Sequence, residues 1–134
     1  MDMYKRIALI RSEEELSELQ DELIDRFGDI PQSVNRLLEI ALLRNLAHEV
    51  YVTQLIWRGT KVRLVLYPKA NIIAQRIPAL IQKYNGHLKF SAEGTPEFSY
   101  ELQVLRGKTN LRPDVKAVLK ELRELLSTAK AELT

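Results

Sequence analysis

The spacing of the apolar residues changes near Tyr51, and the change limits what the chain can fold into. Up to about His48 the apolar residues recur every three or four positions, as they do along one side of a helix. From Tyr51 onward, β-branched and aromatic residues gather in short runs of the kind that form strands. The sequence therefore predicts an α+β fold with helices at the N-terminus and a sheet after them.

Three helices are expected in the first part of the chain. The first is predicted over Met3–Ile10. Ser12 is a good N-cap for a second helix, and Glu15 is placed to complete a capping box. Gly28 is expected to end that helix in the left-handed conformation, because glycine adopts it without a Cβ penalty. The third helix is expected from Pro31 to about His48, since proline suits a first helical turn.

The second of these helices combines an apolar stripe with acidic residues. The stripe has helical spacing and is predicted to face the core: Leu16, Leu19, Leu23 and Phe27. Glu22 and Asp25 lie three positions apart, so they are expected to be neighbours on the outward side. From the residues alone they form an ordinary acidic helix surface. The alternative, an acid-base pair, would need burial to separate the two pKa values.

Two β-hairpins are expected to form a small antiparallel sheet. The first joins strands over 52–57 and 61–67 across a turn at Gly59. The second joins strands over 87–91 and 98–105. The hairpins therefore supply the whole of the predicted sheet.

An intervening helix and a C-terminal helix complete the predicted order. A helix is expected over 71–84, where Pro78 either kinks the middle or delays the start. The last helix is expected to open at Pro113 and Asp114. Because the sequence contains no repeat, low-complexity tract or internal linker, residues 1–134 are expected to form a single domain.

Composition bears on the compartment and on the class of partner. Cysteine is absent, which removes disulfides and thiolate metal sites and agrees with a cytoplasmic location. No apolar run approaches the roughly 20 residues of a membrane span. The net charge is only +2, with basic and acidic residues interspersed, so direct contact with DNA is not indicated. A protein of the cytoplasm without a membrane partner is expected.

The sequence carries no recognisable catalytic motif. His48 and His87 are the only histidines, and neither has the spacing of a metal site. The tripeptide at 107–109, Gly-Lys-Thr, imitates the end of a phosphate-binding loop, but Leu102 stands where that loop needs a glycine. We therefore expect no enzyme activity, no cofactor and no metal in this chain.

A basic stretch, Arg58 to Arg76, offers an alternative function. Its cations alternate with Trp57 and Tyr67, as in surfaces that bind single-stranded nucleic acid. The cations are Arg58, Lys61, Arg63, Lys69 and Arg76. In the other interpretation, the aromatic residues pack on the core and the cations are a solvated face. The alternative is therefore a nucleic-acid-binding accessory module.

Two motifs, in contrast, resemble one protein family. Tyr-Lys-Arg-Ile-Ala stands at 4–8 and Glu-Leu-Ile-Asp-Arg-Phe-Gly at 22–28, followed by Pro31 and a helical pattern. Together they resemble the C-terminal domain of the bacterial transcription-repair coupling factors. The similarity is specific over the first part of the chain, whereas beyond Tyr51 only the order of elements is similar.

The resemblance implies a role and a set of contacts. The chain would be a C-terminal fragment of a much longer multidomain DNA translocase, with ATP and Mg in the parent's motor domains and none in this fragment. It would be an autoinhibitory, non-catalytic interaction domain that packs on the N-terminal UvrB-like domain. There it would mask the UvrA-binding surface until RNA polymerase is engaged. The implied interdomain contacts are Glu22 and Asp25, with Arg26 and Gly28 supporting the helix end.

Overall fold

The computed structural model describes residues 3–70 and 72–126 of the chain. The chain divides into two compact units, Met1–Leu46 and Ala47–Thr134. Each unit is described by itself below. The expected single domain, 1–134, remains a prediction.

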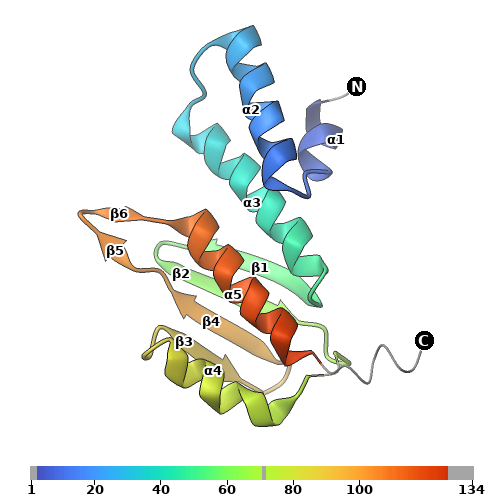
Figure 1. Ribbon diagram of the computed structural model, residues 1–134, viewed down its shortest axis with the longest axis vertical. Helices are drawn as coiled ribbons and strands as arrows, with labels where there is room; N and C mark the ends of the chain where they lie inside the picture. Colours follow the sequence, from blue (N-terminus) through green and yellow to red (C-terminus); the bar gives the residue numbers. More distant parts are fainter. Residues whose placement is uncertain (1–2, 71, 127–134) are drawn as a thin grey trace. The chain divides into compact units, whose positions relative to one another are not determined.

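Three helices form the first unit and confirm the predicted order: α1 over Met3–Ala8, α2 over Glu13–Phe27 and α3 over Gln32–His48 (Figure 1). The last two residues of α3 belong to the second unit, so the helix crosses the boundary without a break. The core of the first unit consists of Ile10, Leu16, Leu19, Leu38 and Leu42.

Both ends of α2 are fixed by the residues that the sequence indicated. The Ser12 hydroxyl accepts a hydrogen bond from the backbone N–H of Glu15 at 3.1 Å. The Glu15 carboxylate accepts from the N–H of Arg11, one residue before the expected capping-box donor, at 3.3 Å. Gly28 ends the helix with φ +84° and ψ −154°, a region open almost only to glycine, and its N–H donates to the carbonyl of Ile24. The glycine stop is confirmed, although its ψ is not that of the left-handed helix.

The predicted inward stripe of α2 is wrong at its last position. Leu16 and Leu19 are buried and Leu23 packs partly against the core, but Phe27 is 75% exposed. The side chains of the stripe become less buried toward the C-terminal end of α2. The helical spacing of apolar residues therefore extends further along α2 than the core does. Leu37 of α3 is likewise exposed, at 64%.

The second unit contains a four-stranded antiparallel sheet in the order β1-β2-β4-β3. Its strands are β1 over Val52–Arg58, β2 over Lys61–Leu66, β3 over Leu88–Ser91 and β4 over Glu97–Glu101. The two predicted hairpins are β1-β2 and β3-β4, and pairing of β2 with β4 joins them. Gly59 turns the first hairpin with φ +60°. The predicted sheet is therefore confirmed, with β1 and β3 at its edges.

The helices of this unit are a 3₁₀ turn η1 over Ala74–Arg76, α4 over Ile77–Lys83 and α5 over Leu111–Leu125. Pro78 lies in the first turn of α4, so it delays the start of the helix rather than kinking it. The predicted start at Asn71 lies outside the described residues. In Figure 1, α5 runs across one face of the sheet. Its buried residues are Leu111, Val115, Val118, Leu119, Leu122 and Leu125.

The predicted strand over 98–105 is wrong, because it is interrupted after Glu101. A separate small hairpin follows, with β5 over Val104–Leu105 paired to β6 over Lys108–Thr109. Arg106 and Gly107 both have positive φ, +54° and +75°, as a tight primed turn requires. The Gly-Lys-Thr tripeptide is thus a hairpin turn and its return strand.

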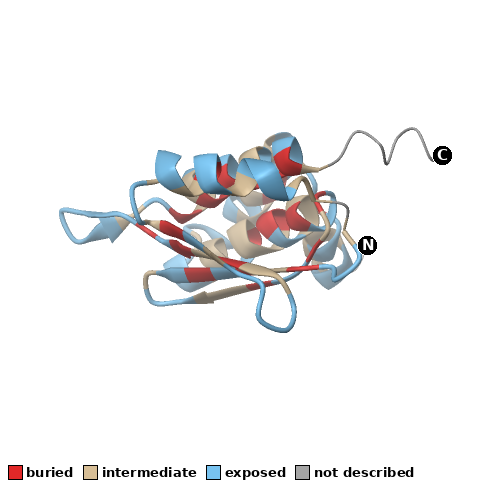
Figure 2. Cartoon of the chain, turned by 90° about the horizontal axis from the view of Figure 1, so that it is seen from below, coloured by how far each residue is buried: buried red, intermediate tan, exposed pale blue. Residues whose placement is uncertain are grey.

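The two faces of the main sheet differ in chemistry. Side chains in register share a face, and one face is apolar, with these buried residues: Leu55, Val62, Leu64, Leu88, Phe98 and Tyr100. Figure 2 shows buried positions on the strands and exposed positions on the outer side of α5. The other face is polar and exposed, with cations on β2 and β3 and carboxylates on β4.

Candidate interaction surface at the end of helix α2

Glu22 is held inside the first unit. Its carboxylate forms an ion pair with the guanidinium of Arg6 on α1. Arg26, one turn further along α2, approaches the other carboxylate oxygen at 3.9 Å. The Glu22 side chain is accordingly only 31% exposed. The ion pair therefore joins the motif at 4–8 to the motif at 22–28.

Asp25 differs from Glu22 although the two lie three positions apart. It is exposed, and within residues 3–70 and 72–126 no basic side chain pairs with it. Arg26 is 62% exposed and reaches back toward Glu22. Helical spacing placed both carboxylates on α2 correctly, but only Asp25 offers a charge without an internal partner.

Two large apolar residues close to Asp25 in sequence are also exposed. Ile24 and Phe27 are 46% and 75% exposed on the same last turns of α2. Beside Phe27 lies a hollow of about 270 Å³ where α2 turns into α3. Its lining residues are Leu23, Phe27, Gly28, Asp29, Ile30, Pro31 and Val34. An exposed aromatic residue beside a hollow is suited to contact with another protein surface.

The basic stretch does not assemble as a nucleic-acid platform requires. Trp57 is in register with Val62, on the apolar face, while Arg63 lies on the polar face. Arg63 makes two hydrogen bonds to the Glu97 carboxylate, at 2.8 and 3.0 Å. These bonds hold the pKa of the Glu97 carboxyl below its usual range. The aromatic ring is therefore on the opposite face from the cation, and the cation is already paired.

The remaining basic residues of the stretch are divided between the sheet and the segment after it. Arg76 donates to the backbone carbonyl of Glu124 at 2.9 Å, which ties η1 to the end of α5. Lys69 and Tyr67 are exposed in the loop after β2. Arg58 and Lys61 are in register at the β1-β2 turn, on the same face of the sheet as Arg63.

The two histidines have separate surroundings in the structure. Nδ1 of His87 lies 3.1 Å from the backbone carbonyl oxygen of Glu101, and His48 is exposed at the end of α3. Over the described residues, no three His, Asp or Glu side chains are arranged to hold a metal ion. Nor is any helix in that part of the chain long and apolar enough to span a bilayer.

This chain is similar to several transcription-repair-coupling factors. The family model of the TRCF domain matches residues 1–77. The transcription-repair-coupling factor of Haemophilus influenzae is 38% identical over 97 residues, covering 67% of this chain and 8% of that protein. The factor of Escherichia coli is 31% identical over 102 residues, covering 76% of this chain and 9% of that protein. This chain therefore spans less than a tenth of the length of these curated relatives.

A solved structure has the same fold. The crystal structure of the C-terminal domain of a transcription-repair coupling factor matches with a TM-score of 0.58 and 28% sequence identity. The match covers 90% of this chain and 78% of that chain. The similarity thus extends well beyond the residues that the family model matches.

Proposed function

Because the chain belongs to the transcription-repair coupling factor family, we propose that it is an autoinhibitory, non-catalytic interaction domain of such a factor. It packs on the N-terminal UvrB-like domain of the same protein and masks the UvrA-binding surface. Engagement of RNA polymerase releases it. ATP and Mg act in the motor domains of the parent protein, outside this chain.

The observation that carries this proposal is the availability of Asp25. Its carboxylate is exposed at the end of α2 and lacks a basic partner within the described residues. An arginine of the partner domain can form a charge-assisted hydrogen bond with it. Exposed Ile24 and Phe27, on the same last turns of α2, supply apolar surface, which a specific interface also needs.

The strength of such a contact suits a releasable clasp. Desolvation offsets much of the attraction between a carboxylate and a guanidinium, so the net stabilisation is modest. When both surfaces belong to one chain, the effective concentration is high and a modest contact holds. A competing partner can then displace it.

Glu22 and its neighbours have supporting roles in this proposal. Through Arg6, Glu22 holds α1 against α2. Arg26 adds a second cation to that carboxylate, and Gly28 fixes where the helix ends. A change at Glu22 therefore affects the folding of the first unit, whereas a change at Asp25 affects only the surface.

The proposal is tested by charge reversal at Asp25 in the full-length factor that contains this chain. We expect Asp25→Lys to raise UvrA binding about 5- to 30-fold, the factor that corresponds to a clasp weakened by one or two kcal/mol. Glu18→Lys is the matched control, because Glu18 is exposed on the same helix about 10 Å nearer its N-terminus. Binding is measured by titration, with circular dichroism to confirm the fold. If the folded full-length Asp25→Lys factor bound UvrA no better than the parent, the assignment of Asp25 as the contact would be wrong.

A further inference from the structure

The strand β3 leaves one of its sides without a partner strand. In the sheet order it lies at the edge, and among the described residues only β4 pairs with it. The N–H of Glu101 donates to the carbonyl of His87 at 2.7 Å, which fixes the alternation of bonded pairs along β3 and β4. Lys89 is then in a bonded pair with β4. Leu88 and Phe90 instead direct their backbone N–H and C=O groups to the open edge.

Helix α4 lies over the sheet rather than across this edge. The ring of Tyr84, at its end, packs edge-on against Tyr100 of the apolar sheet face with ring centroids 5.7 Å apart. Lys83 forms an ion pair with Glu121 of α5, so α4 and α5 belong to the same helical layer. A helix in that layer does not occupy the position of a further strand beside β3.

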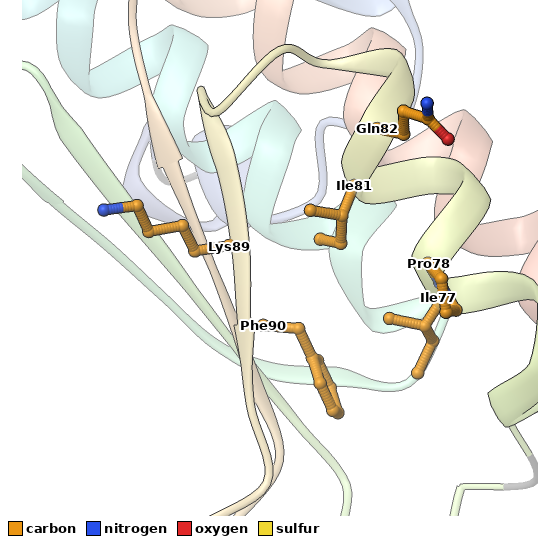
Figure 3. Close-up of a pocket in the computed structure, with 6 residues that line it drawn as sticks. All are labelled: Ile77, Pro78, Ile81, Gln82, Lys89 and Phe90. Carbon is orange, nitrogen blue, oxygen red and sulfur yellow. The ribbon is translucent and has the colours of Figure 1, made fainter.

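A groove of about 650 Å³ follows the edge between α4 and β3. Its lining residues are Ile77, Pro78, Ile81, Gln82, Lys89 and Phe90. In Figure 3, Ile77 and Ile81 point from α4 toward Phe90 of β3, while Lys89 points away from α4. The groove is therefore apolar on the helix side and bounded by an ammonium group on the other.

Positive charge continues around the edge on the polar face. Lys89 also lines a second hollow, of about 390 Å³, together with Lys61 and His87. The Glu101 carboxylate in this hollow accepts from the hydroxyl of Thr60 at 2.7 Å. Over the described residues, no carboxylate is in ion-pair contact with Lys89 or Lys61. A ligand at this edge thus meets apolar side chains on one face and unpaired cations on the other.

We propose that this groove binds an extended segment of a partner protein, which pairs with β3 as a fifth strand and alternates apolar with acidic residues. Successive side chains of a strand point to opposite faces, so alternate residues of the segment enter the groove against Ile77 and Ile81. The residues between them lie on the polar face. The one opposite Lys89 is in a non-hydrogen-bonded pair, where side chains approach most closely, and an acidic side chain fits there.

The charge of Lys89 also argues against a second copy of this chain as the occupant. If two β3 strands paired antiparallel, with Leu88 of one bonded to Phe90 of the other, the Lys89 residues of the two copies would be directly opposite. Like charges in that position are destabilising. A lysine on an edge strand commonly prevents such self-pairing.

Strand addition is tested by amide hydrogen exchange, measured by NMR on the 134-residue chain with the probe peptide acetyl-Val-Glu-Val-Glu-Val-Glu-Val-amide. At saturation we expect the amides of Leu88 and Phe90 to exchange at least tenfold more slowly, with that of Lys89 unchanged. Binding to side chains alone would not produce this alternation. Equal exchange rates with and without the peptide would overturn the proposal.

The charge preference is tested by exchanging charges between protein and peptide. Lys89→Glu is expected to lower the affinity for the Glu peptide at least fivefold. It is expected to raise the affinity for a peptide with Lys in place of Glu. Lys120→Glu, an exposed change on α5, is the matched control and is expected to alter neither affinity. An unchanged preference in Lys89→Glu contradicts the proposed register. Dimers in sedimentation runs, with Leu88 and Phe90 protected without peptide, would instead identify a second copy as the occupant.

Discussion

At the scale of single residues, Glu22 and Asp25 carry the same charge but have different surroundings. Glu22 lies beside Arg6 of another helix, and Asp25 faces solvent. Helical spacing predicts that both lie on the surface of α2, but it contains no information about the side chain across from each. The difference depends on where α1 folds back, which is a tertiary property.

The conformation of Gly28 gives a prediction at this scale. Its φ of +84° with ψ −154° is strained for any residue with a Cβ, although no atom lies within 4 Å of the position that a Cβ would take. Gly28→Ala is therefore expected to lower the free energy of unfolding by about 1–3 kcal/mol through backbone strain alone. Urea unfolding, monitored by circular dichroism, measures this change in the free energy of unfolding. Asp29→Ala, at the exposed neighbour without positive φ, should change little, and equal effects of the two changes would contradict this explanation.

At the scale of elements, pairing of β2 with β4 holds the two hairpins in one sheet. Arg63 and Glu97 form a diagonal ion pair across these strands, two register positions apart on the same face. The hydrogen bonds from Arg63 lower the pKa of Glu97 in the folded chain. A carboxyl whose folded pKa is depressed stabilises the fold above its unfolded pKa, and the stabilisation is lost as the pH falls through the folded value.

Glu97→Gln should therefore destabilise the chain at pH 7 and have no such effect in strong acid. The difference in melting temperature from the parent should shrink as the pH falls below about 4.3, the ordinary value for glutamate. Melting curves of both proteins from pH 7 to pH 2.5 measure this difference in melting temperature. Glu93→Gln, in the exposed β3-β4 loop, is the control and should show no such trend. A difference for Glu97→Gln that stayed constant over this range would exclude the ion pair as its cause.

Element order was predictable because each long element has a local signal. Ser12 and Gly28 bound α2, and Gly59 turns the first hairpin. The β5-β6 hairpin was missed because its strands have two residues each, too few to display a period. The exposure of Phe27 was missed because spacing identifies a stripe but not how far the core extends beneath it. The groove beside β3 depends on strand order, which no local pattern specifies.

At the scale of the whole molecule, the two units are linked by one uninterrupted helix. Leu42 of α3 is in the core of the first unit, and the same helix ends at His48, beyond the boundary. Because α3 has residues in both units, unwinding it would disrupt helical structure in each of them. The shared helix is a physical reason to expect that both units unfold together.

Core substitutions in each unit test this coupling. Leu42→Ala and Phe98→Ala each remove a fully buried side chain and should cost about 2–5 kcal/mol. If the chain is one cooperative domain, both changes lower the midpoint of the same transition. Amide exchange under mild denaturant, read separately for α2 and β4, measures whether the two units unfold together. Val104→Ala, a change at an exposed site, is the control. Faster exchange confined to the substituted unit would mean that the units unfold independently.

The ion pair between Arg6 and Glu22 changes how the family signature is understood. The two motifs that identify the chain are far apart in sequence, yet these two residues meet between α1 and α2. A substitution at either position alters the surroundings of the other, so a charge change at Arg6 acts on α2 as well as on α1. What looks like two separate motifs along the sequence is, at this point of the fold, a single contact between two helices.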